Sequence, residues 1–204
     1  MTDAAAFCLA SASPRRRELL SQIGLKPRIL PSDIDESVLE GESPHAYVCR
    51  MATEKARKAS ATLASQGQGL PVLAADTAVI SKLQILGKPE SKSDAVRMLT
   101  LLSESEHSVL SAVALDSDRG LKVVLNDTRV QFRKISPAEM DSYWHSGEPK
   151  DKAGAYAIQG LGSVFVRAIH GSYSGVVGLP LYETVELLRE YGIEIPALPI
   201  TRTR

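Results

Sequence analysis

The sequence has few cysteines, no net charge and no long apolar run, and each shortage excludes a class of protein. Only Cys8 and Cys49 occur among the 204 residues, which excludes a disulfide framework and the paired spacing of a zinc site. We therefore expect a reducing compartment, the cytoplasm. The 24 basic residues are balanced by 24 acidic ones, so there is no excess positive charge to coat nucleic acid.

No apolar run approaches the roughly 18 to 20 residues that cross a bilayer, so no membrane is expected. The apolar run at 4–12 is short and follows Asp3, which is unlike the basic start of a secretory signal. With 44% hydrophobic and 24% charged residues, the composition is typical of a folded chain. We expect a single domain over 1–204, with a loose tail at 196–204.

Hydrophobic periodicity and turn signals predict an α/β protein with a mixed β-sheet and flanking helices. Ser-Pro pairs at 13–14, 43–44 and 136–137 are typical of helix starts, the last within a capping box. The glycine-rich stretch 147–162 predicts a long loop, and such loops commonly carry function. The predicted strands are 7–11, 27–31, 71–75 with 78–80, 109–115, 121–125 with 130–132, and 164–169, and the predicted helices are 14–23, 43–63, 93–102, 136–146 and 181–191.

Three common motifs, the nucleophile elbow, the dinucleotide fingerprint and the P-loop, are excluded because a required residue is replaced in each. Tyr173 stands at the nucleophile position of a possible elbow, and Phe165 replaces the third glycine of a dinucleotide fingerprint. Pro89 follows Gly87-Lys88 where a P-loop has Ser or Thr. The four histidines form no i, i+4 pair, so a histidine metal cage is not expected.

The first strand-to-helix turn predicts an anion pocket. Ser11, Ser13, Arg15 and Arg16 gather there, where helix N–H groups and guanidinium groups favour phosphate. The alternative is that Ser13 only caps the helix and that the arginines lie on its solvent-exposed face.

Asp76-Thr77 directly follows an apolar strand, where a partly dry carboxylate can act as a general base. The alternative is a turn in which Asp76 caps backbone N–H groups. Lys55 and Lys88 are lone lysines, a kind of residue that is usually solvated surface. Asp33, Asp35 and Glu36 could bind a hard divalent cation, although the residues taken alone favour an exposed acidic turn.

Five ordered motifs across nearly the whole chain resemble the Maf family of nucleoside triphosphate pyrophosphatases. The motif at 154–159, Gly-Ala-Tyr-Ala-Ile-Gln, is similar to the branch that hydrolyses dTTP and UTP, whereas the branch acting on 7-methyl-GTP differs there. The resemblance implies an elongated, two-lobed architecture with a central cleft, similar to inosine triphosphatases. The motifs are 9–16 (LASASPRR), 74–77 (AADT), 86–89 (LGKP), 147–160 (GEPKDKAGAYAIQG) and 177–180 (VGLP).

The resemblance also implies roles for single residues. Asp76 is the expected proton acceptor that activates water for attack on the α-phosphorus, which releases nucleoside monophosphate and pyrophosphate. Lys55 and Lys88 are expected to act with it on the phosphates. A divalent cation, Mg²⁺, Mn²⁺ or Co²⁺, is expected on Asp35 and Asp76. The expected substrate-binding residues are Ser11, Ser13, Arg15, Arg16, Thr77 and Gln159, of which Arg15, Thr77 and Gln159 set specificity.

Alternatives remain open at this stage. The chain could be a nucleotide-binding regulator of cell division with little turnover, or a Maf-like pyrophosphatase with another base preference. Asp35 stands where many family members have Glu, which shortens its reach by one methylene, and Gly175 stands where Asn is expected. The expected partner is the nucleoside triphosphate, and a homodimer is an option that the sequence leaves open.

Overall fold

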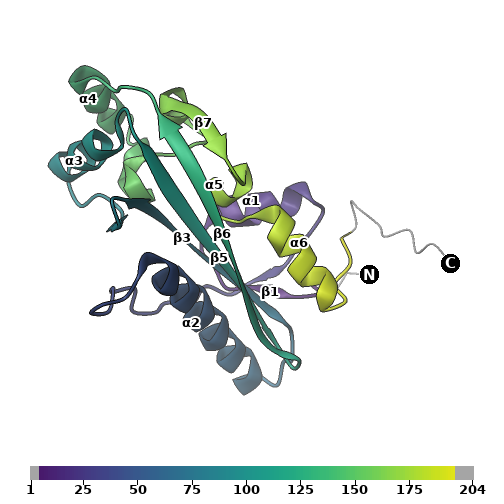
Figure 1. Ribbon diagram of the computed structural model, residues 1–204. Coiled ribbons are helices and arrows are strands. Elements are labelled where there is room, and N and C mark those ends of the chain that lie inside the picture. Colours follow the sequence, from purple (N-terminus) through teal and green to yellow (C-terminus); the bar gives the residue numbers. More distant parts are fainter. Residues whose placement is uncertain (1–4, 196–204) are drawn as a thin grey trace.

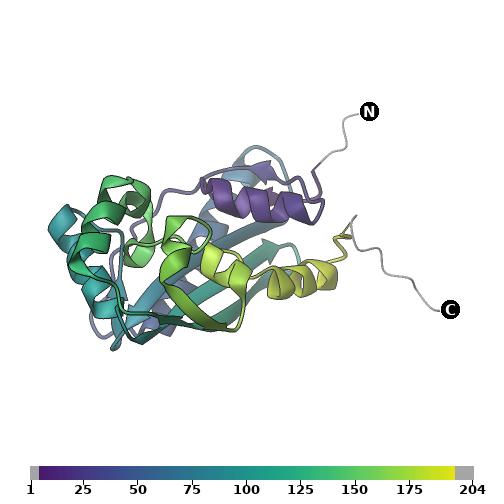
Figure 2. The ribbon, with the colours of Figure 1, turned by 90° about the horizontal axis from the view of Figure 1, so that it is seen from above.

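A seven-stranded mixed sheet with helices on both faces forms the protein, in a computed structural model that describes residues 5–195 (Figures 1 and 2). This confirms the predicted α/β class. The strands are β1 (Cys8–Leu9), β2 (Arg28–Ile29), β3 (Val72–Ser81), β4 (Gln84–Leu86), β5 (Glu106–Ser117), β6 (Gly120–Phe132) and β7 (Val166–His170). The helices are α1 (Pro14–Gln22), α2 (Pro44–Ser65), α3 (Lys92–Leu102), α4 (Pro137–His145), α5 (Tyr173–Val177) and α6 (Leu181–Glu190).

The sheet has the order β2-β1-β3-β5-β6-β7, with β4 paired to β3. β1 runs parallel to β2 and β3, and the remaining pairs are antiparallel. Figure 1 shows β3, β5 and β6 crossing the whole molecule. The predicted hairpin is therefore confirmed, and its two strands are longer than expected, since β5 and β6 pair along almost their whole length.

Side-chain alternation along β3 divides the core between the two faces of the sheet. Its even-numbered residues, such as Ala74 and Ala78, pack with the small residues Ala52, Ala56 and Ala59 of α2. Its odd-numbered residues, such as Leu73 and Ala75, pack in a second cluster that includes buried residues of α1 and α6. Neighbouring residues of β3 therefore face different surroundings.

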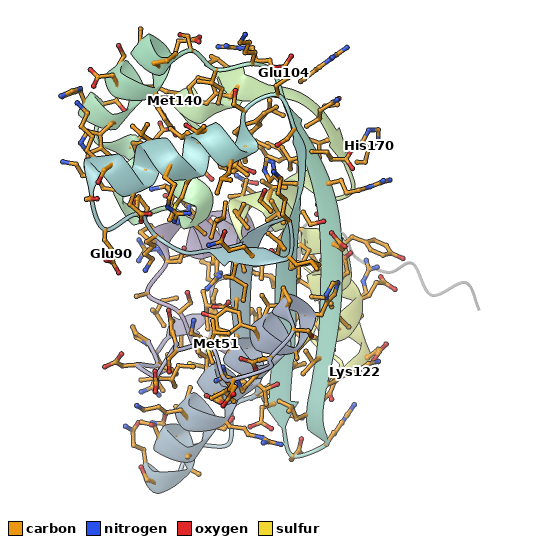
Figure 3. The ribbon with its side chains drawn as sticks, turned by 60° about the vertical axis from the view of Figure 1, so that its left-hand side comes forward. Met51, Glu90, Glu104, Lys122, Met140 and His170 are labelled. Atoms are coloured by element: carbon orange, nitrogen blue, oxygen red, sulfur yellow. The ribbon has the colours of Figure 1, made fainter. Side chains whose placement is uncertain are left out.

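A third core fills the other end of the long strands. It joins α3 and α4 to the aromatic residues Phe132, Tyr156 and Phe165. In Figure 3 this end carries Met140, whereas α2 with Met51 covers the opposite end. α4 starts at the predicted capping box, in which Ser136 and Glu139 each bond the other's backbone N–H.

One edge of β3 is open in its middle. β1 pairs with Val72 and Leu73, and β4 pairs with residues 79–81. Between them, within residues 5–195, no strand pairs with residues 74–78 on this edge. The strand centre thus has no neighbouring strand on this side of the sheet, although most of its residues are buried.

Several local predictions need correction. β3 is one continuous ten-residue strand, so Asp76 and Thr77 lie inside it and form neither an interruption nor a turn. β4 and α5 were not expected. Residues 161–165 form a 3₁₀ turn before β7 rather than part of the strand, and the loop 147–162 contains further 3₁₀ turns at Glu148–Asp151 and Ala153–Ala155. The predicted tail at 196–204 lies outside the described residues.

Within residues 5–195, no helix combines the length and the apolarity of a membrane span.

Candidate active site

A cleft of about 490 Å³ opens where β3 lacks a strand partner, a size within the usual range of small-molecule sites. A second cavity shares seven of its lining residues and extends to the start of α1. Tyr47 and Lys55 of α2 line the first cleft, as do Ala153 and residues 156–159. Glu90, another lining residue, is labelled in Figure 3 at the α3–α4 end of the molecule. This arrangement agrees with the expected central cleft between two lobes.

A lysine between two carboxylates forms the charged centre of the cleft. Lys55 Nζ lies 2.7 Å from Asp76 Oδ1 and 2.6 Å from Glu36 Oε1. Asp76 and Lys55 are 8% and 9% exposed, and a buried charge requires a partner of opposite sign. Asp76 faces α2 because it is an even-numbered residue of β3, and Lys55 occupies the facing position of the helix.

Glu36 is the second carboxylate at this centre. Burial alone would raise the pKa of Glu36, but the hydrogen bond from Lys55 and the positive charges of Lys55, Lys88 and Arg16 lower it overall. The group is therefore ionised at neutral pH. Its side chain is still 52% exposed, so it can also face a ligand in the cleft.

The structure places Asp35, the predicted metal ligand, away from this centre. Its Oδ1 accepts hydrogen bonds from the hydroxyl and the backbone N–H of Ser37, at 2.7 and 2.9 Å, and these bonds lower its pKa. Asp35 is exposed and is not among the residues that line either cavity. Glu36 lines the cleft instead, where its carboxylate pairs with Lys55.

The start of α1 forms the end of the cleft that suits an anion. Ser13 is the N-cap residue, but its side chain makes no capping hydrogen bond. Its backbone N–H donates to Ser11 Oγ at 3.2 Å. Residues 13–16, which begin the helix, line the second cavity, and N–H groups at a helix start favour an anion. Arg15 also lies 3.6 Å from Asp151 on the opposite wall.

Arg16 is held by protein groups. Its Nε donates to the carbonyl of Gly178 at 2.8 Å, and its two NH groups approach Ser11 Oγ and Thr77 Oγ1 at 3.3 and 3.4 Å. Burial lowers the pKa of Arg16, while the charge of Asp76 acts in the opposite direction. Arg16 thus joins α1, β3 and the segment after α5 at the base of the cleft.

Thr77 lies on the face of β3 opposite to Asp76. Its hydroxyl is 2.9 Å from that of Ser111, which in turn donates to the carbonyl of Gly175 at 2.7 Å. Ser111 is fully buried, so this chain of hydrogen bonds fixes the rotamer of Thr77. It also connects α5 to the cleft, and Gly175 suits this position because a Cβ there would approach Asn126 and Ser172 closely.

Gln159 lies in the wall of the cleft formed by residues 156–159. This residue is exposed and lines the cleft beside the buried residues Tyr156 and Ile158. The hydroxyl of Tyr156 pairs with Nε2 of His107 at 2.9 Å, and burial lowers the pKa of His107 to about 4. Lys88 lines both cavities from the loop after β4.

Nine of the ten predicted site residues therefore lie around the two cavities, and Asp35 is the exception. The acidic group at 33–36 indicated a segment that reaches the cleft. Sequence spacing did not show that Glu36, rather than Asp35, lines it. Tyr47 and Asp151 also line the cleft and were not singled out from the sequence.

The profile of the Maf-like protein family matches residues 6–191. The chain belongs to the Maf family. Among curated proteins, it is 51% identical over 188 residues to the dTTP/UTP pyrophosphatase of Methylobacillus flagellatus, covering 92% of this chain and 94% of that protein. It is 48% identical over 193 residues to the dTTP/UTP pyrophosphatase of Saccharophagus degradans, covering 95% and 92%.

A third Maf relative, the dTTP/UTP pyrophosphatase of Neisseria meningitidis, is 47% identical over 192 residues, covering 92% of this chain and 95% of that protein. A solved nucleoside-triphosphatase / dITP/XTP pyrophosphatase from Mycobacterium abscessus matches 69% of this chain and 94% of its own at 16% identity. Its TM-score of 0.39 is too low to inform fold or function.

The buried centre of this Maf protein makes a prediction about stability. Lys55→Met should remove the ammonium group that pairs directly with both Asp76 and Glu36, which should lower the free energy of unfolding by about 3–5 kcal/mol near pH 7.5. The loss should shrink as the pH falls, because like-charge repulsion in the variant favours proton uptake by Glu36, and that uptake relieves the repulsion.

Urea unfolding of wild type and variant between pH 5 and 8 measures this effect. Lys58→Met, an exposed position one turn along the same helix, is the matched control and should change stability little at any pH. A Lys55→Met loss that is small or independent of pH would contradict the buried-centre account.

Proposed function

We propose that this protein hydrolyses dTTP and UTP to the nucleoside monophosphate and pyrophosphate. The observation that carries the proposal is a buried carboxylate, Asp76, in the middle of a cleft between an anion-binding helix start and an exposed amide, Gln159. The three pyrophosphatases named above, each about half identical in sequence, support the substrate assignment.

The helix start would hold the phosphates. Backbone N–H groups of α1 and the side chains of Arg15 and Lys88 offer hydrogen bonds and positive charge to phosphate oxygens. Such groups stabilise the charge that spreads over the oxygens in a phosphoryl-transfer transition state. Arg15 lies near Asp151 in the free protein. When the substrate binds, Arg15 would contact its phosphate oxygens instead of Asp151.

Asp76 would accept the proton of the water that attacks the α-phosphorus. Lys55 fixes one oxygen of this carboxylate and leaves the other for water. A carboxylate near phosphates is unfavourable for binding alone, because like charges repel. Its presence therefore favours hydrolysis over the alternative of a nucleotide-binding regulator.

A divalent cation fits the groups at the centre. Glu36 and Asp76 each bind the ammonium group of Lys55 through one oxygen. Their second oxygens would hold Mg²⁺, which typically uses one or two carboxylates together with substrate phosphates. No group of three or more possible His, Cys, Asp or Glu ligands exists within residues 5–195, so phosphate oxygens would complete the shell. The cation, when bound, supplies charge neutralisation of the phosphates.

Gln159 would read the base. Its amide offers one acceptor and donors, which match the imide edge of thymine or uracil. Thr77 would contribute to specificity indirectly, since its hydroxyl is already bonded to protein groups. We also propose a cytoplasmic location, consistent with free Cys8 and Cys49.

The first prediction concerns Asp76. Asp76→Asn should reduce turnover of dTTP and UTP by at least about 1,000-fold while nucleotide binding is retained, because the general base is lost and the size is kept. Pyrophosphate release from a panel of nucleoside triphosphates measures turnover. Asp118→Asn, in the exposed β5–β6 turn, is the control. Full activity of Asp76→Asn would remove it from the mechanism, and wild-type binding without turnover would favour the regulator.

A second prediction concerns Gln159. Gln159→Ala should lower kcat/KM for dTTP and UTP about tenfold relative to that for CTP and the purine nucleotides, because base hydrogen bonds are lost. Ser163→Ala, an exposed neighbour in the same loop, should leave the ratio unchanged. An equal loss on every nucleotide would contradict the base-reading role.

A third prediction separates the two candidate metal ligands. Mg²⁺ should raise the Tm of wild type in the presence of a non-hydrolysable UTP analogue beyond the effect of the analogue alone. Glu36→Gln should remove most of this increment, and Asp35→Asn should retain it, because only Glu36 lies in the cleft. If Asp35→Asn removes the increment and Glu36→Gln retains it, Asp35 is the ligand. If the wild type shows no increment, the proposed cation site is contradicted.

A further inference from the structure

The position of Gln159 depends on its loop, residues 156–162. Gln159 is exposed at the cleft, so packing does not hold its side chain. The loop turns sharply there, with the N–H of Gly160 donating to the carbonyl of Ala157 at 3.3 Å. Base reading by Gln159 therefore requires another element to fix the loop backbone.

One carboxylate fixes the far side of this turn. Glu148 Oε2 accepts the N–H of Leu161 at 2.8 Å, and Glu148 Oε1 accepts the N–H of Gly162 at 3.0 Å. Burial would raise the pKa of Glu148, but these bonds and one from Tyr143 lower it overall. The carboxylate is therefore ionised at neutral pH and acts only as an acceptor.

Tyr143 fixes the near side. Its hydroxyl donates to Glu148 Oε1 at 2.6 Å and accepts the N–H of Ala157 at 3.0 Å. The tyrosine is 4% exposed, and its ring packs edge-on against Phe165. Tyr143 and Glu148 together form a clamp that holds the backbone on both sides of Gln159.

The glycines of the loop fit around this clamp. A Cβ at Gly160 would lie 2.0 Å from Glu148 Oε2, and a Cβ at Gly162 would lie 2.6 Å from the hydroxyl of Tyr143. All three atoms nearest to the Gly160 position belong to Glu148. Glycine at 160 and 162 therefore leaves the space that the Glu148 carboxylate and the Tyr143 hydroxyl occupy.

We propose that Tyr143 and Glu148 are positioning residues that set base selectivity by holding Gln159 in its reading geometry. Neither residue is among those that line the cleft, so both act through the loop. The inference rests on the proposed function, in which Gln159 reads the base. A reading amide that is displaced by about 1 Å loses its advantage for the matching base.

Glu148→Gln is the decisive variant, because it keeps the size and turns one acceptor into a donor. The amide cannot accept all the N–H and O–H groups that the carboxylate accepts. We expect the ratio of kcat/KM for UTP to kcat/KM for CTP to fall about tenfold, mainly through a higher KM for UTP. Tyr143→Phe, which keeps the ring in the core, should shift the ratio in the same direction.

A purely structural role would not move this ratio. Loss of folded enzyme scales the rates on both nucleotides equally, so the ratio is independent of the active fraction. Val185→Ala, in the core cluster of α6, is the control: it should lower the Tm and leave the ratio unchanged. The double variant Tyr143→Phe/Glu148→Gln should shift the ratio little beyond the larger single effect, because the pair acts as one unit.

Binding of non-hydrolysable UTP and CTP analogues provides the same ratio without turnover. A wild-type protein with no preference for UTP in either assay would refute the proposed function together with this inference. A wild-type preference that both single variants retain would refute the clamp alone. A reduced preference in both variants, with the control unchanged, would establish it.

Discussion

The charge of Asp76 in the middle of a buried strand constrains the whole structure. A carboxylate at that place needs a cation, and Lys55 is the residue of α2 that reaches it. The helix can lie close to the sheet because its facing residues are alanines at 52, 56 and 59. Glu36 is attracted to the same ammonium group, which draws the segment after β2 over the cleft. One ion cluster therefore aligns helix, strand and loop.

The alternation of β3 then divides the cleft into two chemical surfaces. Asp76 faces α2 and Lys55, whereas Thr77 faces Arg16 and the hydrogen-bond chain through Ser111 to α5. Both are accessible because β1 ends after Leu9 and β4 begins its pairing only at Val79. A short gap in strand pairing thus lets the centre of a sheet serve as the floor of a site.

Local sequence signals predicted the α/β class and most helices, whereas the resemblance to the Maf family implied many of the residues around the cleft. Ser-Pro pairs and the capping box at Ser136 define helix starts within a few residues. Sequence reasoning failed where contacts between residues distant in sequence determine the local structure. The burial that keeps Asp76 in a strand comes from α2, and the inward turn of Glu36 rather than Asp35 depends on Lys55, 19 residues away in sequence. The link between Glu148 and the Gln159 loop is likewise visible only in the fold.

A structure of the protein with a non-hydrolysable UTP analogue tests the central claim most directly. The account predicts the uracil beside Gln159, the α-phosphorus within reach of a water bound to Asp76, and the terminal phosphates at the start of α1. The opposite orientation, with the base at α1 and the phosphates at Gln159, would contradict it.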